Sequence, residues 1–279
     1  MRKSISLCLA LLSLSTSAIA IAQNNFFTQW EERVRSTSAQ QPSWVVPVFT
    51  PSSGLVQLAR ADMIRQITAA RTITWNYDGS KGFNLIPWYK TEVDVNLPPY
   101  IQHNTAAAKD GAGDLSFLMK YRVAAANEKQ GSYSVSAAVA ATVPTGSYKN
   151  GALSGTVSPT IFLGKGYGAL DVQTAASVSL PTGHTSTLGR PVSWNTAFQG
   201  KVKKIYWPEV EINSTFYRGG PNDGKVQTFA TPGVMIGKIK FRSDPKDRLG
   251  LFFGVGDQIA LSSYHAYNHA LSFSTRIVF

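Results

Sequence analysis

The sequence has a single cysteine, Cys8, and it lies close to the N-terminus. A chain with one thiol cannot form an internal disulfide, and a zinc site built from several cysteines is excluded as well. Charged residues are also scarce, at 15% of the chain. Beyond the N-terminus no run of about 18 apolar residues occurs, so the sequence predicts no transmembrane helix there.

The first 22 residues have the composition of a secretory signal peptide. Arg2 and Lys3 are followed by an apolar stretch, and small residues stand at Ala20 and Ala22. We expect cleavage after Ala22, which would remove the only cysteine. The alternative, an uncleaved anchor helix, would need a longer apolar run with fewer serines.

Positive charge exceeds negative charge in this sequence. It has 27 Lys and Arg residues against 16 Asp and Glu residues, a formal net charge of +11. A basic protein can bind nucleic acid, but an export signal argues against that partner. Outer-membrane lipid, anionic lipopolysaccharide and small-molecule solutes are the expected partners, and nucleic acid is not.

Residues 23–54 differ in composition from the rest of the chain. The stretch that contains Phe26, Phe27, Trp30 and Val34 predicts a short amphipathic helix. The following sequence, "QPSWVVPVFTPSSG", contains prolines that prevent a long regular element. We interpret this segment as a periplasmic tether or a plug.

From residue 55 onward, strand-like runs alternate with turns. Tight turns such as "DGSKG" (78–82) alternate with longer loops such as "PTGSYKNGALSG" (144–155). Short periplasmic turns and long extracellular loops are typical of bacterial outer-membrane barrels. About twelve strands are predicted, over roughly 55–66, 70–77, 83–97, 114–126, 133–143, 156–166, 169–180, 194–203, 207–218, 226–240, 247–260 and 269–279.

The predicted strands have one apolar and one polar face. Val210, Ile212 and Phe216 alternate with Glu209 and Glu211, for example. A soluble barrel points the apolar face inward and a membrane barrel points it outward. The signal peptide and the loop asymmetry favour the membrane barrel. The charged residues predicted to line its lumen are Lys90, Glu92, Asp94, Lys120, Arg122, Asp171, Lys201, Lys203, Glu209, Glu211 and Arg276.

One strand does not follow this alternation cleanly. Strict alternation from Leu249 places Asp257 on the outer face, whereas a bulge at Gly254 or Gly256 would turn it inward. The side of Asp257 therefore stays open.

The final stretch, "HALSFSTRIVF", predicts a strand that ends on an aromatic residue. Outer-membrane barrels carry a C-terminal aromatic that the barrel-assembly machinery reads. We expect Phe273, Ile277 and Phe279 to form this assembly signal.

The stretch "DGAGDLSFLMKYRV" (110–123) carries a family resemblance. With "VPTGSY", "SPTIFLGKGYGALDVQTAASVSLPTG", "YWPEVEIN" and "TFATPGVMIGKIK", it resembles the outer-membrane barrel transporters labelled "MetA-pathway of phenol degradation". The resemblance covers roughly residues 45–279. It implies an exported barrel, but it brings no catalytic residue and no established substrate.

Little in the sequence indicates catalysis. The four histidines fall in or beside long loops, at positions that fit no zinc spacing. Ser263 and His265, with Asp257 as the orienting acid, would be needed for a lipid hydrolase at the barrel rim.

Two carboxylates, Glu209 and Glu211, share one strand face. A glycosidase pair is one interpretation. Salt bridges to Lys201 and Lys203 on the neighbouring strand are the preferred one.

The sequence thus predicts an all-β protein, a single transmembrane antiparallel barrel in the cell outer membrane. Its parts are a signal peptide (1–22), a tether or plug (23–54) and the barrel (55–279). The expected function is passive passage of small solutes, with aromatic or hydrophobic ones among the candidates. No enzyme activity, catalytic residue, metal or cofactor is expected. The alternatives are the rim-acting lipid hydrolase and a non-conducting structural or binding barrel.

Overall fold

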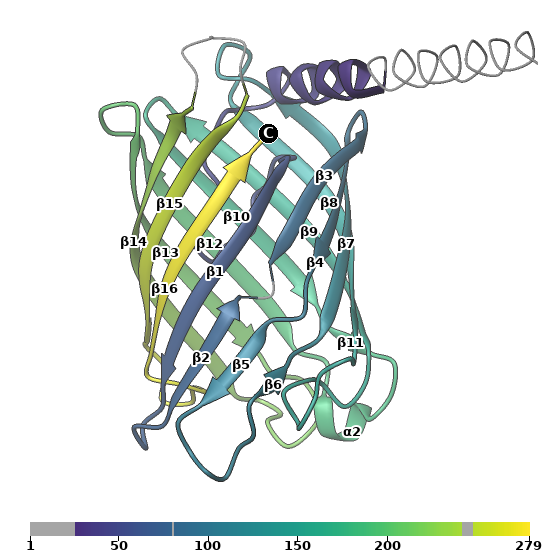
Figure 1. Ribbon diagram of the computed structural model, residues 1–279, viewed down its shortest axis with the longest axis vertical. Coiled ribbons are helices and arrows are strands. Elements are labelled where there is room, and N and C mark those ends of the chain that lie inside the picture. The colour runs from purple at the N-terminus through teal and green to yellow at the C-terminus, as the bar shows by residue number, and fades with distance from the viewer. Residues whose placement is uncertain (1–25, 80, 242–247) are drawn as a thin grey trace, which may run out of the picture.

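A computed structural model of the chain describes residues 26–79, 81–241 and 248–279. A helix over residues 26–39 and an irregular stretch over residues 40–57 precede a closed barrel that begins at Leu58 (Figure 1). None of the helices among these residues is both long and apolar enough to span a membrane. The predicted signal peptide lies outside the described residues.

Sixteen strands form one antiparallel sheet. The last strand, β16, pairs with the first, β1, and this pairing closes the sheet into a barrel. The strands are β1 (Leu58–Ile67), β2 (Ile73–Asp78), β3 (Gly82–Trp88), β4 (Thr91–Asn96), β5 (Tyr100–His103), β6 (Gly111–Ala112), β7 (Leu115–Ala126), β8 (Tyr133–Val143), β9 (Thr156–Tyr167), β10 (Leu170–Val178), β11 (Leu180–Pro181), β12 (Val192–Gly200), β13 (Tyr206–Phe216), β14 (Val226–Lys240), β15 (Gly250–Ala260) and β16 (His269–Val278). A one-turn helix, α2 (Thr185–Leu188), lies in the loop before β12.

Several of these strands are pieces of one longer barrel strand. Along one side of β1 lie first β3 and then β2, so β2 and β3 together form one strand of the wall. In the same way β4 continues into β5 and β6 into β7, while β11 extends β10. Counted in this way the barrel has twelve antiparallel strands, and the predicted fold class is confirmed.

Two predicted boundaries near the start of the barrel are wrong. Asp78 and Gly82 belong to the same wall strand and do not flank a turn between two strands. The run 83–97 is a hairpin that turns at Tyr89 and Lys90. The composition of residues 78–82 is typical of a turn, but Gly79 has another role: it lets the backbone lie close to Asp62 of β1. A Cβ on Gly79 would lie 2.7 Å from Cβ of Asp62. The true turn lacks glycine, and Lys90 adopts a φ of 66°, which is uncommon for a residue with a side chain.

The two ends of the barrel differ. At one end, which we call the turn end, lie the C-terminus, the 26–39 helix and the turn at Tyr89 and Lys90 (Figure 1). At the opposite end, the loop end, lie the connections 104–110, 144–155, 217–225 and α2. The asymmetry predicted from the sequence is present.

The apolar strand faces point outward. Met119, Ile161 and Trp194 have exposed fractions of 57%, 59% and 56%. Gln173 and Glu211, which point into the barrel, are fully buried. A soluble barrel would bury large apolar side chains, whereas a lipid-facing wall presents them on its surface.

Asp257 lies on the outer face. The pairing of β15 with β16 is regular from Gly250 to Ile259, so no bulge turns this carboxylate inward. The irregularity lies instead in β14, between Ile236 and Ile239. Near the loop end, Oδ2 of Asp257 lies 3.4 Å from Nδ1 of His269.

We predict that a short Gly-Ser insertion between Tyr89 and Lys90 leaves a folded barrel. Lengthening a turn costs only about 0.6 kcal/mol per doubling of loop length. The same insertion between Lys81 and Gly82 should abolish the heat-modifiable, folded band on a gel, because it separates paired parts of one wall strand. If the barrel instead folded with the insertion after Lys81 and failed to fold with the insertion after Tyr89, the turn would lie at 78–82, as the sequence predicts.

Candidate functional site

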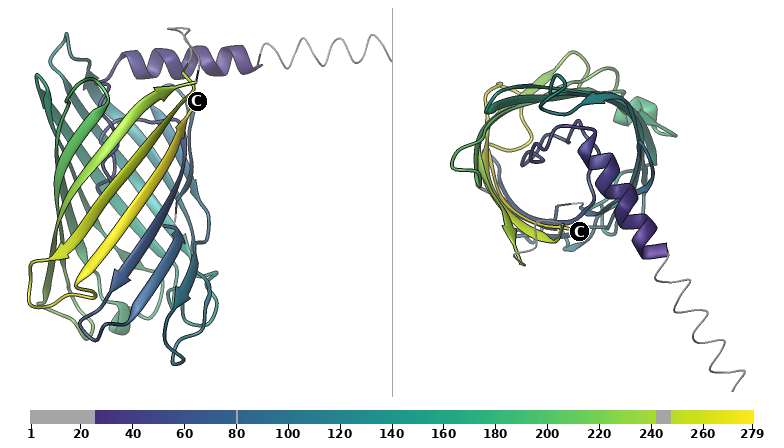
Figure 2. Two further views of the ribbon diagram at one scale, coloured as in Figure 1. Left: turned by 60° about the vertical axis from the view of Figure 1, so that its left-hand side comes forward. Right: turned by 90° about the horizontal axis from the view of Figure 1, so that it is seen from above.

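The N-terminal helix lies across the turn end of the barrel, at a large angle to the barrel axis (Figure 2). On its inner side Val34 packs with Leu55 and Ile86. Nε1 of Trp30 donates to Oε1 of Gln57 at 2.9 Å. After the helix the chain enters the barrel, and residues 40–57, which we call the plug segment, have no regular secondary structure.

Two lumen carboxylates bind the backbone of the plug segment. Oε1 of Glu209 accepts the N–H of Val48 at 2.9 Å. Glu211 accepts two backbone N–H groups, that of Phe49 at 2.8 Å and that of Thr50 at 2.5 Å, one on each oxygen. Three successive backbone N–H groups, which have no partner in a strand or helix, thereby donate hydrogen bonds to carboxyl groups.

A second group of acceptors lies on other strands. Oε2 of Glu92 accepts the N–H of Val56 at 2.5 Å. Gln173 uses both ends of its amide. Its Oε1 accepts the N–H of Ser53 at 3.1 Å, and its Nε2 donates to the carbonyl of Val45 at 3.0 Å. The plug segment is therefore bound from several sides of the wall.

Cationic side chains bind the carbonyl groups of the plug segment. Arg276 donates to the carbonyls of Val46 and Pro47, the latter at 2.7 Å. Nζ of Lys120 donates to the carbonyls of Ser52 and Gly54, both at 3.2 Å.

Further donors come from the same lumen. Lys120 also forms a buried salt bridge of 2.8 Å with Glu92. Hydroxyls of Ser134 and Ser136 donate to the carbonyl of Ser53, at 3.0 and 2.8 Å. Arg60 pairs with Asp62 at 2.5 Å and also donates to the carbonyl of Val48.

Apolar contacts complete the packing of the plug segment. Val45 and Val48 form a cluster with Trp207 and Met235 from the wall. Phe49 packs against this cluster. The segment thus has both its polar backbone and its apolar side chains buried in the lumen.

The segment is also fixed at the turn end. Oε1 of Glu128, in the β7–β8 turn, accepts the backbone N–H and the hydroxyl of Ser43, at 2.7 and 2.6 Å. Partial burial acts to raise the pKa of Glu128, but these hydrogen bonds outweigh it and the pKa is lowered. The carboxylate therefore stays ionised at neutral pH. Arg122 donates to the carbonyl of Thr37 at 2.7 Å.

The plug segment fills the turn-end half of the lumen. On β13 the inward residues Trp207, Glu209 and Glu211 are buried, whereas Asn213 and Thr215 nearer the loop end are partly exposed. The same change along the inward face occurs on β8, β10 and β12. The loop-end half of these walls faces accessible space.

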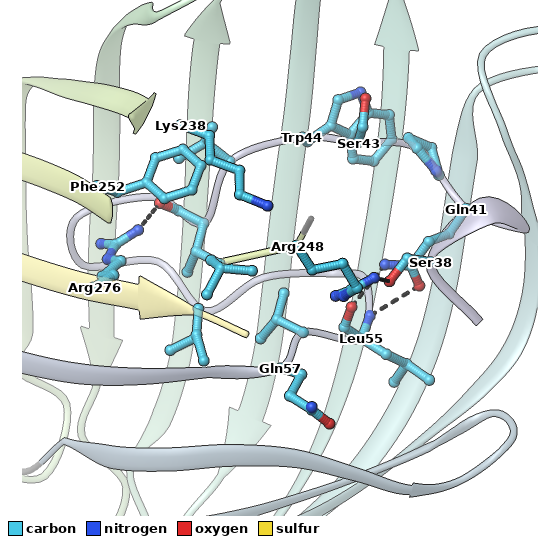
Figure 3. A pocket seen from close by; sticks show the side chains of 16 residues that line it. Ser38, Gln41, Ser43, Trp44, Leu55, Gln57, Lys238, Arg248, Phe252 and Arg276 are labelled. Atoms are coloured by element: carbon cyan, nitrogen blue, oxygen red, sulfur yellow. Dashed lines mark hydrogen bonds between the residues drawn. The ribbon is translucent and has the colours of Figure 1, made fainter. Parts of the chain in front are cut away.

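Two cavities remain beside the plug segment. One, of about 220 Å³, opens near the turn end and is lined by residues such as Trp44, Leu55 and Phe252 (Figure 3). The other, of about 190 Å³, lies deeper, against the wall of β1, β3, β4 and β7. Its lining includes Lys81 and Asp94.

Most of the charged residues predicted for the lumen are buried on the inner face. Three are not. Lys90 lies in the β3–β4 turn, and Lys201 and Lys203 lie in the turn before β13, all exposed. The reason is that the strands end earlier than predicted, β12 at Gly200. The buried ones are Glu92, Asp94, Lys120, Arg122, Asp171, Glu209, Glu211 and Arg276.

The expected salt bridges of Glu209 and Glu211 with Lys201 and Lys203 are consequently wrong. The carboxylates bind the plug backbone, and Glu209 also accepts a hydrogen bond from Gln199 at 2.6 Å.

Sequence reasoning missed several lumen residues. Arg60 and Asp62 lie in β1, where both faces carry polar residues, so alternation gives little signal. Gln173 and Gln199 fall on the polar face of their strands, but without charge they did not stand out.

The residues of the hydrolase alternative are not brought together. Both ring nitrogens of His265 are engaged, with the carbonyl of Ser262 at 2.8 Å and with Asn268 at 2.9 Å. Asp257 contacts His269 on the outer face. Among the described residues no group of three or more acidic, histidine or cysteine side chains is placed to hold a metal ion.

Comparison with known proteins agrees with this architecture. Residues 61–196 match the family described as "Putative MetA-pathway of phenol degradation". No curated protein matches the chain. Among solved structures the chain is similar to an outer membrane channel from Pseudomonas putida F1, with a TM-score of 0.53 and 15% identity over 85% of this chain and 100% of that one.

That likeness concerns the fold, because the sequence identity is low. The resemblance inferred from the sequence is confirmed by the match of residues 61–196 to the model of that family. The chain as a whole has the fold of an outer-membrane channel.

Proposed function

We propose that this protein is an outer-membrane channel for passive passage of small solutes, and that its own plug segment restricts the opening. The signal peptide would direct its export, and the barrel-assembly machinery and outer-membrane lipid would be its partners. The observation that carries the proposal is the plug segment itself. A barrel with this fold holds an irregular stretch of its own chain in half of its lumen, bound from several strands.

The binding of the plug segment is strong for a piece of irregular backbone. Hydrogen bonds to charged groups contribute about 1.5–3 kcal/mol each. Glu211, Glu92 and Arg276 all make such bonds to it. We infer that the segment stays in place at rest and narrows the channel, while charges of both signs set the field along the path.

The solute class is also part of the proposal. Aromatic or hydrophobic solutes fit the cavity near the turn end, whose lining includes Trp44, Val45 and Phe252. Its volume of about 220 Å³ exceeds the ~150 Å³ of an apolar cavity that holds benzene. A solute with an aromatic ring has room there.

The first prediction concerns removal of the segment. The mature chain and a variant lacking residues 23–54 are refolded and reconstituted in planar bilayers. Because half of the lumen is cleared, we expect the variant to conduct at least about twofold more current per channel. Equal conductance would show that the segment does not restrict the path. Absence of current from both would overturn the channel function.

The second prediction uses a single substitution in the full mature chain. Glu211→Gln places an amide donor opposite a backbone N–H, so one charge-assisted hydrogen bond is lost and two donors face each other. We expect about 2 kcal/mol weaker binding of the segment, measured as faster proteolysis between residues 40 and 57 in the folded barrel. Glu32→Gln, on the exposed side of the helix, is the matched control. Equal cleavage of both variants would contradict the role of Glu211.

The third prediction tests the solute class. Benzoate and gluconate carry the same charge, but only benzoate has an aromatic ring. If the turn-end cavity accepts rings, benzoate should reduce the ion current at about tenfold lower concentration, since about 1.4 kcal/mol of extra burial gives that factor. Equal block by both anions would remove aromatic solutes from the proposal.

A further inference from the structure

The two cavities beside the plug segment are neighbours. Both are lined by Val46, Val56 and Leu58, which form a shared boundary between them. The turn-end cavity lies between the plug segment and the ends of β14, β15, β16 and β1 (Figure 3). The deeper one lies between the same segment and β1, β3, β4 and β7. Together they follow one side of the plug segment into the barrel.

The shared boundary is apolar, whereas the lining of each cavity beside it also includes charged residues. Two of its side chains belong to the plug segment, and Leu58 is the first residue of β1. The backbone of Val56 is fixed by Glu92, so this side chain has a defined position. A narrow apolar boundary between two wider spaces can close to ions by losing its water.

The deeper cavity also has one ionisable side chain of each kind, Lys81 and Asp94, that forms no salt bridge among the described residues. Its other charges are paired: Lys120 bonds with Glu92, and Arg60 bonds with Asp62. Asp94 is 7% exposed, and its Oδ1 has no hydrogen-bond partner. Within the described residues no hydrogen bond or ion pair joins the ammonium of Lys81 either.

A buried carboxyl group such as that of Asp94 is costly when one of its oxygens lacks a partner, so it is retained where a ligand or water meets it. Lys81 and Asp94 both line this cavity, which is large enough for several water molecules or a small hydrated ion. Each can therefore act directly on a passing solute without first breaking a salt bridge.

We propose that solutes pass beside the plug segment, which stays in place. The route runs from the turn-end cavity, across the neck of Val46, Val56 and Leu58, into the deeper cavity, where Lys81 and Asp94 select for charge. This inference rests on the proposed channel function. It names the path and the residues that control it.

Charge selection is tested with two substitutions in the full chain. Lys81→Gln should raise the cation-to-anion permeability ratio by about twofold or more, and Asp94→Asn should lower it by a similar factor, because each removes one sign of charge from the path. The matched controls are Lys129→Gln in an exposed turn and Asp257→Asn on the outer face. Shifts no larger than those of the controls would overturn the role of Lys81 and Asp94.

The neck is tested by changing its width. Val56→Ala should increase single-channel conductance by about twofold, and Val56→Phe should reduce it to less than about half. Val139→Ala, on the outer face of β8, is the matched control. An unchanged conductance in both Val56 variants would overturn the route.

The route and the channel function can fail separately. Suppose that the variant lacking residues 23–54 conducts while the wild type, Val56→Ala and Val56→Phe carry no current. The channel function would then be supported, and the route beside the plug segment would be wrong. If every form is silent, the channel function itself is wrong. Opposite shifts of the permeability ratio in the Lys81 and Asp94 variants, together with the expected conductance changes in the Val56 variants, would support both the channel function and the route.

Discussion

Charged side chains enclosed by a barrel wall need partners, and so does an irregular backbone enclosed by the same wall. In this protein the charged side chains and the irregular backbone are hydrogen-bond partners of each other. Glu209 and Glu211 accept amides of the plug segment, and Arg276 and Lys120 donate to its carbonyls. Without the segment these charges would stand in a water-filled lumen, and without the charges the segment would lose its partners.

This mutual pairing explains why the lumen is rich in charge while the chain as a whole is not. The buried charges gather at the level of the plug segment, and inward positions nearer the loop end are mostly neutral, as Asn195, Asn213 and Thr215 show. On the outer wall the charge described above lies at the other end of the barrel. Asp257, which contacts His269, lies on the outer face near the loop end, where a charge facing lipid costs only about 0–1 kcal/mol.

Much of this architecture can be predicted from the sequence, because strand alternation is a strong local signal. Alternation assigns Glu92, Lys120 and Arg276 to the inner face, and the structure places them there. It does not place the turn at Lys90, since that turn lacks the usual residues and a nearby glycine serves close packing instead.

The partners of the lumen charges were harder to predict. Salt bridges between Glu209 or Glu211 and lysines of the next strand were the natural expectation from side chains alone. The actual partners are backbone amides of residues more than 150 positions away. Backbone amide and carbonyl groups are the same in every residue except proline, so no pattern of side chains reveals which of them are used.

The origin of the plug contacts has a consequence for the order of assembly. The plug segment directly precedes β1 in the chain, yet it is bound by residues from Arg60 in β1 through to Arg276 in the final strand. Its complete binding site exists only once β16 has joined β1. Full seating of the segment is therefore a late event, and a barrel whose seam is still open cannot hold its own N-terminal segment in the final arrangement.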